Sequence, residues 1–304
     1  MGVQMISAVI ATKNRTEQIM RLIESIQKQT IKVEEILIID QSQNDYSNLF
    51  LYNPNIHYYH TPEIEGLTMA RNFGIDNSIG EYVLFLDDDL ELLEDFNEKI
   101  LLLFKSYPDV IGICGTQITY LNRSSFYLRI SRLFKIGPFR PEYSKKDQYN
   151  SISFRRMNKI SGGITMYRRS ILNEHRFDEN MIGYCLGEDA DYSYSIQKYG
   201  VLLKSFEAKA HHYHNPSGRI NLIEDYDSRI CFYNYFYSKH LKTNTNKHQY
   251  FFCFLWVIIG VILDGLYKSI KLKSLDPIKG ILSGFMRSKN GYRGAKCLKL
   301  KIQR

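Results

Sequence analysis

Gly80–Asp89 reads GEYVLFLDDD: a turn glycine, an apolar run without alternation, and then three consecutive carboxylates. The unbroken apolar run, Tyr82–Leu86, is typical of a strand that is buried on both faces, as in a parallel sheet. The apolar positions of Leu90–Phe104 then recur at helical spacing, which predicts a helix immediately after the carboxylates. The three carboxylates are therefore expected in a turn at the carboxyl end of a central strand, where open α/β sheets bind their ligands.

The three carboxylates suggest a metal site. Asp87, Asp88 and Asp89 repel one another, and a divalent cation is the simplest way to relieve that repulsion. Hard oxygen ligands favour Mg²⁺ or Mn²⁺, which would be shared with a phosphate-bearing substrate. The alternative is that these residues only cap the following helix and interact with its positive end. A calcium-binding EF-hand loop is excluded, because Leu92 stands where that loop requires a glycine.

Two earlier predicted strands also end in polar turns. Met5–Ala11 is followed by the turn Thr12–Arg15, and Val33–Asp40 stops at a carboxylate. The other predicted elements are a strand at Asn55–His60 and helices at Arg15–Gln29 and Gly66–Gly80. Alternation of strands and helices with short connections predicts an α/β fold with a doubly wound, mostly parallel sheet.

These turns are expected to meet at one edge of the sheet and to bind a nucleotide. Thr12–Arg15, Asp40 and Asp87–Asp89 would come from neighbouring strand ends, and Arg71 would add a cation for a phosphate group. The sequence contains neither GxGxxG nor GxxxxGK[ST]. This argues against a dinucleotide-dependent dehydrogenase and against a P-loop enzyme.

An ordered set of motifs resembles the family 2 glycosyltransferases of GT-A fold. The set comprises SAVIATKNR, LIIDQSQND, GLTMARNFGI and YVLFLDDD, in this order and spacing. Further along, SGGITMYRR (Ser161–Arg169) is similar to the acceptor-side glycine segment of the family, and GEDADYSYSIQKYG (Gly187–Gly200) to its ED motif. The resemblance runs from about Ser7 to His214. One departure is DQSQND, in which Gln41 replaces the second acid of the DDGSxD pattern of many relatives.

The resemblance implies a metal-dependent, inverting glycosyltransferase with a nucleotide-sugar donor, a UDP-sugar being favoured. The residues implied to hold the nucleotide are Ala11, Thr12, Asn14, Arg15, Asp40, Arg71, Asp87 and Asp88. The implied ligands of Mn²⁺ or Mg²⁺ are Asp89 and Asp87, with either His212 or His214 completing the metal shell. The implied catalytic base is Asp189, with Glu188 beside it to position the acceptor.

Local patterns bear on two of these assignments. Strand alternation through AHHYHNPSGR would place His212 and His214 on one face, although a lone histidine is more often structural. Glu188 and Asp189 open an apparent amphipathic helix, where acids also simply complement the helix dipole.

The charge of the chain is uneven along its length. Residues 231–304 contain fourteen Lys and Arg against two acids, a balance of +12, whereas the net charge of the whole chain is +8. The first 230 residues therefore carry −4. We expect a catalytic domain at residues 1–230 and a basic helical tail at residues 231–304.

The tail is expected to associate with a membrane. Tyr250–Leu263 is almost wholly apolar, but at about fourteen residues it is shorter than the roughly twenty needed to span a bilayer. Apolar turns with basic edges suit the anionic cytoplasmic face of a membrane. The alternative is a helical hairpin that packs on the catalytic domain or on a second subunit, giving a homo-oligomer. Nucleic acid is not expected as a partner, because the lysines and arginines of the tail lie among aliphatic residues.

The remaining composition is consistent with a peripheral cytoplasmic protein. The five cysteines are odd in number and widely spaced, which indicates reduced buried thiols. The first residues show no charged-then-apolar leader, so no secretory signal is expected. Membrane affinity favours a lipid-linked saccharide of surface polysaccharide synthesis as the acceptor. The alternatives are a GT-A-like nucleotidyltransferase and a catalytically inactive membrane-bound scaffold.

Overall fold

A computed structural model describes residues 5–119, 130, 132–143, 148–183, 185–213 and 220–288. The chain forms two compact units, each made of three separate segments. The first contains Met1–Tyr120, Glu142–Asp178 and Tyr192–Asn215, and the second contains Leu121–Pro141, Glu179–Asp191 and Pro216–Arg304. The expected division into 1–230 and 231–304 places its boundary inside a helix, Leu222–Phe236, and it remains a proposal about function.

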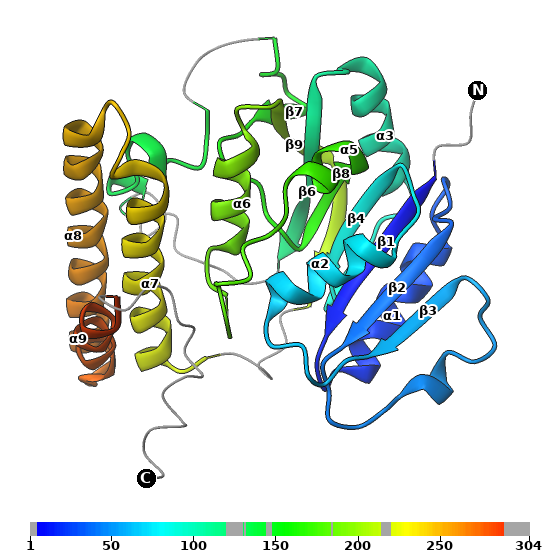
Figure 1. Ribbon diagram of the computed structural model, residues 1–304, viewed down its shortest axis with the longest axis horizontal. Coiled ribbons are helices and arrows are strands. Elements are labelled where there is room, and N and C mark those ends of the chain that lie inside the picture. The colour runs from blue at the N-terminus through cyan, green and yellow to red at the C-terminus, as the bar shows by residue number, and fades with distance from the viewer. Residues whose placement is uncertain are drawn as a thin grey trace. The chain divides into compact units, whose positions relative to one another are not determined.

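The first unit is built on a nine-stranded sheet, counted over the described residues (Figure 1). The strand order is β3-β2-β1-β4-β8-β6-β9-β5, and β7 pairs with β9. The strands are β1 Ile6–Thr12, β2 Glu35–Asp40, β3 Ile56–His60, β4 Tyr82–Asp87, β5 Leu90–Leu92, β6 Val110–Thr119, β7 Phe154–Arg156, β8 Ile164–Arg168 and β9 Val201–His212. The α/β class is confirmed, and β1 to β4 are parallel. β8 is antiparallel to both of its neighbours, a direction that a buried apolar run does not reveal.

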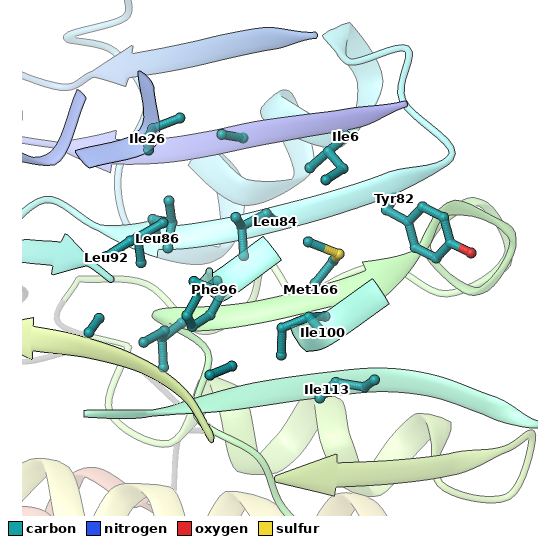
Figure 2. Packing of buried hydrophobic residues seen from close by; sticks show 14 of the residues in the cluster. Ile6, Ile26, Tyr82, Leu84, Leu86, Leu92, Phe96, Ile100, Ile113 and Met166 are labelled. Carbon is teal, nitrogen blue, oxygen red and sulfur yellow. The ribbon is translucent and has the colours of Figure 1, made fainter. Parts of the chain in front are cut away.

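Helices cover both faces of this sheet. They are α1 Thr16–Gln27, α2 Leu67–Asn77, α3 Phe96–Ser106, α5 Arg169–Glu174 and α6 Glu188–Ile196. One hydrophobic core lies between the sheet and helices α1 and α3, and Figure 2 shows Leu84, Phe96 and Met166 packed within it. A second core on the other face contains side chains of α2, α5 and the latter part of α6. Because both faces are buried, β1, β2 and β4 consist almost wholly of apolar residues.

The helix after the carboxylates begins later than its spacing predicts. Leu90–Leu92 forms β5, which pairs antiparallel with the end of β9, and α3 begins only at Phe96. The prediction of a helix directly after Asp89 was therefore wrong. Pairing with a distant strand satisfies the backbone groups of this short segment, and sequence periodicity does not report such a partner.

The second unit is helical in the part of the chain that the structure describes. Its elements are the 3₁₀ turn Gly137–Phe139, α7 Leu222–Phe236, a single π-helical turn at Tyr237–Leu241, α8 Lys247–Leu272 and α9 Asp276–Ser288. The apolar helix was predicted too short, because α8 continues past Asp264. The carboxylate of Asp264 accepts a hydrogen bond from the Tyr226 hydroxyl at 2.7 Å and pairs with Arg229 at 3.3 Å, so α7 neutralises it.

The length of α8 bears on membrane association. With 26 residues and a window of mean hydropathy 2.0, α8 is long and apolar enough to cross a membrane, and 28% of that window is buried. At 1.5 Å per residue the helix is roughly 39 Å long. Length and composition alone do not distinguish a spanning helix from one that lies on a surface.

The cysteines that the structure describes agree with the expectation of free thiols. Cys114, Cys185, Cys231 and Cys253 are buried and form no disulfide. Burial raises the pKa of the Cys231 thiol to about 11, so it stays protonated at neutral pH. Cys297 lies outside the described residues.

Candidate active site

The polar strand ends meet at the carboxyl edge of the first unit's sheet, as the sequence predicts. Thr12 at the end of β1 pairs with Asp40 of β2, and Ala11 pairs with Asp87 of β4. This pairing brings the predicted nucleotide-binding residues of three adjacent strands to one edge.

Asp88 points inward and is held by two residues from the turn after β1. Its carboxylate accepts hydrogen bonds from the Thr12 hydroxyl at 2.8 Å and from the Arg15 guanidinium at 2.7 Å. Asp88 is only 5% exposed, and this burial raises its pKa, although Arg15 and Thr12 oppose the shift. Asp88, Thr12 and Arg15 therefore brace one another.

Asp89 contacts His212 across the β5–β9 pair. Leu90 lies opposite His212 in that pair, and the His212 Nε2 atom is 3.0 Å from Asp89 Oδ1. On the other side of the ring, Nδ1 lies 3.1 Å from Gln117 Oε1 of β6. An Nδ1–H donated to Gln117 leaves Nε2 to carry a second proton or to offer its lone pair to a cation. His214, the other candidate, lies outside the described residues.

Asp87 is the most exposed of the three carboxylates, with 39% of its side chain accessible. Its backbone N–H donates to the Gly163 carbonyl at 2.8 Å, and a Cβ atom on Gly163 would lie 1.9 Å from Asp87 Oδ2. Gly163 thus leaves the space that this carboxylate occupies. The Arg71 guanidinium is 3.9 Å from Asp87 Oδ1.

Arg71 is almost fully buried at 3% exposure and lies beside aromatic rings. Its guanidinium carbon is 5.8 Å from the centre of the Phe85 ring and 5.3 Å from that of Phe177. The neighbouring Asn72 exchanges two side-chain hydrogen bonds of 3.0 Å with the Phe177 backbone, which anchors α2. The position of Arg71 beside Asp87 is therefore fixed by packing.

Asp40 belongs to a second polar group beside a small cavity. Its carboxylate accepts hydrogen bonds from the Tyr58 hydroxyl at 2.8 Å and from the Ser42 backbone N–H at 2.8 Å. The Ser42 hydroxyl in turn accepts from the backbone N–H of Asn14, which has a left-handed φ of 57° that asparagine tolerates. Burial raises the pKa of the Tyr58 phenol, and the adjacent Asp40 adds to the effect. The cavity is lined by Thr12, Arg15, Thr16, Ile19, Ile38, Asp40, Tyr46, Phe50 and Tyr58.

The residues at this edge could supply some, but not all, of the ligands of a metal ion. They therefore suit a metal whose remaining ligands come from a substrate. Among the described residues, no three His, Cys, Asp or Glu side chains are grouped so as to hold an ion. Asp89 and His212 are in contact, however, and Asp87, two residues before Asp89, is the most exposed of the three carboxylates. One or two carboxylates completed by substrate phosphates are typical of Mg²⁺, and an added imidazole is better suited to Mn²⁺.

Glu188 and Asp189 begin a helix, α6, as predicted. The sequence placed them in the catalytic domain 1–230, whereas in the structure they belong to the second unit. The Asp189 carboxylate accepts the backbone N–H of Ala190 at 2.7 Å. Asp191, two residues later, is buried and pairs with Lys239 at 2.8 Å and His240 at 2.7 Å from the π-helical turn. Asp191 is therefore engaged in internal ion pairs. The assignment of Asp189 as the catalytic base, with Glu188 beside it, stays a prediction.

Three residues near the site were not predicted individually from the sequence. Gln117 contacts the ring of His212, Tyr58 holds Asp40, and Gly163 makes room for Asp87. Gly163 lies in the glycine segment that the resemblance had already singled out. Gln117 and Tyr58 lie within strands and have no local signal, because only the neighbouring strand shows what their side chains contact.

Residues 7–176 match the family model described as glycosyl transferase family 2. The chain belongs to this family. A family 2 relative in Campylobacter jejuni, named GalNAc(5)-diNAcBac-PP-undecaprenol beta-1,3-glucosyltransferase, is 28% identical over 190 residues, which cover 59% of this chain and 56% of the relative. This chain spans only 14% to 56% of the length of this and three other relatives that it matches.

Two solved structures share the fold. S. aureus TarS, residues 1–349, has a TM-score of 0.57 and 16% identity, covering 93% of this chain and 80% of that one. GalNAc-T7, solved with UDP, GalNAc and Mn²⁺, has a TM-score of 0.54 and 18% identity, covering 80% of this chain and 52% of that one. At this identity the likeness shows the GT-A-type fold alone.

Proposed function

We propose that the protein is a metal-dependent, inverting glycosyltransferase that moves a sugar from a nucleotide-sugar donor, with a UDP-sugar favoured, to a lipid-linked saccharide. The observation that carries the proposal is the group of polar residues at the carboxyl edge of the sheet within a family 2 domain. The name of the C. jejuni relative, which includes a PP-undecaprenol-linked saccharide, supports this acceptor class in surface glycan synthesis. The UDP and Mn²⁺ of the GalNAc-T7 structure support the donor and the metal.

The donor would bind along this edge. The nucleoside would lie beside Asp40, Asn14 and Tyr58, which hydrogen bonds through Ser42 and Asp40 link into one polar group. The buried cation of Arg71 would attract the diphosphate, and Asp88 would keep Thr12 and Arg15 in place. A preorganised polar edge of this kind needs little rearrangement when the donor binds.

The metal would be held by Asp89, by His212 and by Asp87. A bound Mn²⁺ or Mg²⁺ would offset the negative charge of the diphosphate leaving group. Asp189 would accept the proton of the acceptor hydroxyl while the hydroxyl oxygen attacks the anomeric carbon, and Glu188 would position the acceptor. A single displacement by this route inverts the anomeric configuration.

A lipid-linked acceptor would be met at the membrane. We therefore place the protein at the cytoplasmic face of the cell membrane, bound peripherally. The positive balance of residues 231–304 supports this location, because cytoplasmic membrane faces are anionic.

The experiment is a screen of nucleotide-sugars for binding and turnover, with and without Mn²⁺. Thermal shift should identify a donor whose stabilising effect requires the metal, because ligands that bind only the native state raise its stability. Turnover should release free nucleoside diphosphate. Release of pyrophosphate would instead indicate a nucleotidyltransferase, and metal-independent donor affinity in a folded Asp89→Ala variant would contradict the metal assignment.

A further inference from the structure

One face of α8 is apolar although it is exposed. Between residues 251 and 270, every α8 side chain that is more than a third accessible is apolar. We call these nine residues the outer face: Phe251, Phe252, Leu255, Trp256, Ile259, Leu263, Leu266, Tyr267 and Ile270. A helix at the surface of a soluble protein normally presents polar side chains to water.

The charged residues of this stretch lie on the opposite side of α8, toward α7. Asp264 accepts a hydrogen bond from Tyr226 and pairs with Arg229, both on α7. Lys268 is 3.8 Å from Asp264 and lies over the Tyr226 ring. Figure 1 shows α7 running alongside α8, and both helices contact α9. The outer face therefore carries no charge. The two charged residues lie on the packed side of α8, whose buried side chains, such as Val257 and Val261, are otherwise mostly apolar.

Basic residues stand at both ends of the outer face. Lys242 and Lys247 are exposed before it, and Lys271 and Lys273 are exposed after it. The acids among the described residues 242–288 are Asp264, which faces α7, and Asp276, which is half-buried and lies 3.7 Å from Lys279. An apolar strip with lysines at each end complements a surface that has an apolar interior and negative headgroups.

The polar N–H group of Trp256 is already hydrogen-bonded within the protein. Its indole N–H already donates to the Leu133 carbonyl at 2.9 Å, and its ring centre is 5.2 Å from that of Phe134. Moving the exposed part of the ring from water into lipid would therefore leave no unpaired donor.

We propose that the outer face of α8 docks on an anionic membrane, with α8 lying in the plane of the interface. A spanning arrangement would carry Asp264, Lys268 and the α7 cation Arg229 into the hydrocarbon layer, at a high cost in free energy. A second copy of this chain would bring the same lysines together without acids to pair with them. In-plane docking buries the apolar strip and leaves the lysines among anionic headgroups.

The test uses the full chain and vesicles of phosphatidylcholine with or without phosphatidylglycerol, in the absence of donor. The result is thus independent of the proposed transferase activity, which is measured separately by nucleoside diphosphate release. The wild type should float with the anionic vesicles, release in high salt with mild detergent, and show a blue shift in the emission of Trp256, its only tryptophan. An Ile259→Glu, Leu263→Glu double variant should bind at least about tenfold more weakly, because a charge cannot enter the apolar layer.

The matched control is Ile152→Glu, which adds a charge at an apolar side chain that is 97% exposed in the first unit. The control should bind vesicles as the wild type does. Equal binding by all three proteins, or by none, would overturn the proposal. Dimerisation of the wild type without vesicles, lost in the double variant, would assign the face to a second copy instead.

The depth of Trp256 separates in-plane docking from spanning. In the plane of the interface, bromine atoms placed high on the acyl chains should quench Trp256 more than bromine atoms placed near the chain ends. Stronger quenching by the deep bromine atoms would show that α8 crosses the bilayer and would overturn the in-plane arrangement.

Discussion

The polar edge of the first unit and the outer face of α8 depart from the usual distribution of residues in opposite ways. At the polar edge, charged side chains are buried: Asp88 and Arg71 are 5% and 3% exposed. On α8, large apolar side chains are exposed instead, Ile270 at 80% and Phe252 at 69%. Each buried charge has a partner supplied by the chain, such as Arg15 for Asp88. The described part of the chain covers the outer face only in part, as where Leu133 and Phe134 contact Trp256.

The difference shows where each region needs something from outside. Buried ion pairs that are satisfied internally hold a site in shape before its ligand arrives. Exposed apolar area has no such internal compensation, and it is relieved only when another surface covers it. These properties support the two proposals: that the polar edge is a preformed site and that the outer face of α8 docks on another surface.

The largest effect is expected at Asp189, which belongs to the helical second unit. A catalytic role for Asp189 would mean that the second unit takes part in catalysis as well as in docking. Asp189→Asn keeps the shape of the side chain but removes the proton acceptor. Transfer at saturating donor and acceptor should fall by about 10²–10⁴-fold, with donor affinity nearly unchanged. Glu188→Gln is the comparison and should mainly raise the acceptor KM. If Asp189→Asn turns over normally and Glu188→Gln is inactive, the two roles are reversed.

The next effect tests whether the polar edge is internally braced. Asp88→Ala leaves Arg15 and Thr12 without their shared carboxylate and should lower the free energy of unfolding by about 2 kcal/mol, since Arg15 can partly turn to solvent. Urea denaturation measures this change. Asp87→Ala removes the same group where it is more exposed, and it should cost clearly less stability. An equal loss in both variants would show that Asp88 is no special brace.

A smaller effect concerns the space beside Asp87. In Gly163→Ala the new Cβ would overlap the Asp87 carboxylate, which must turn away. Donor affinity should fall about tenfold, which is about 1.4 kcal/mol, because one carboxylate is misplaced while the fold persists. Isothermal titration with donor and Mn²⁺ measures it, and an unchanged melting temperature is the control. Unaltered affinity would remove Asp87 from the donor site.

The smallest effect is expected at Asp227, a buried carboxylate of the helical unit, which contrasts with the carboxylates of the polar edge. Asp227 of α7 accepts a hydrogen bond from Ser283 at 2.8 Å and pairs with Arg287, and burial raises its pKa. Ionisation of Asp227 therefore lowers the free energy of unfolding. The stabilisation by the protonated carboxyl is complete below the unfolded-state pKa and is lost as pH rises through the raised native pKa.

The variant Asp227→Asn isolates this dependence. The free energy of unfolding of the wild type, relative to the variant, should be greatest below the ordinary aspartate pKa of about 3.9 and should decline toward neutral pH. Urea denaturation of both proteins across this range measures the difference. A relative stability that rises with pH would mean that Arg287 lowers the pKa of Asp227.

The sequence by itself determined the repeated units of the fold and the residue types at the edge. The apolar runs of β1, β2 and β4 and the polar residues that follow them are local patterns, because a strand buried on both faces is mostly apolar along its length. The buried polar pair Ser7 and Glu35, which hydrogen bond to each other across β1 and β2, is the exception. The adjacency of Thr12, Asp40 and Asp87 followed from the rule that parallel strands end at one edge.

Only the tertiary structure decided which of these residues do what. Asp88 turns inward and Asp87 outward, because Thr12 and Arg15 of another strand end receive the first and Gly163 leaves space for the second. His212 reaches Asp89 because β5 pairs with β9, a contact between segments far apart in the chain. Likewise Asp264 does not interrupt α8, because Arg229 of α7 neutralises it. Local sequence carries no record of such distant partners, so contacts of this kind appear only when the chain is folded.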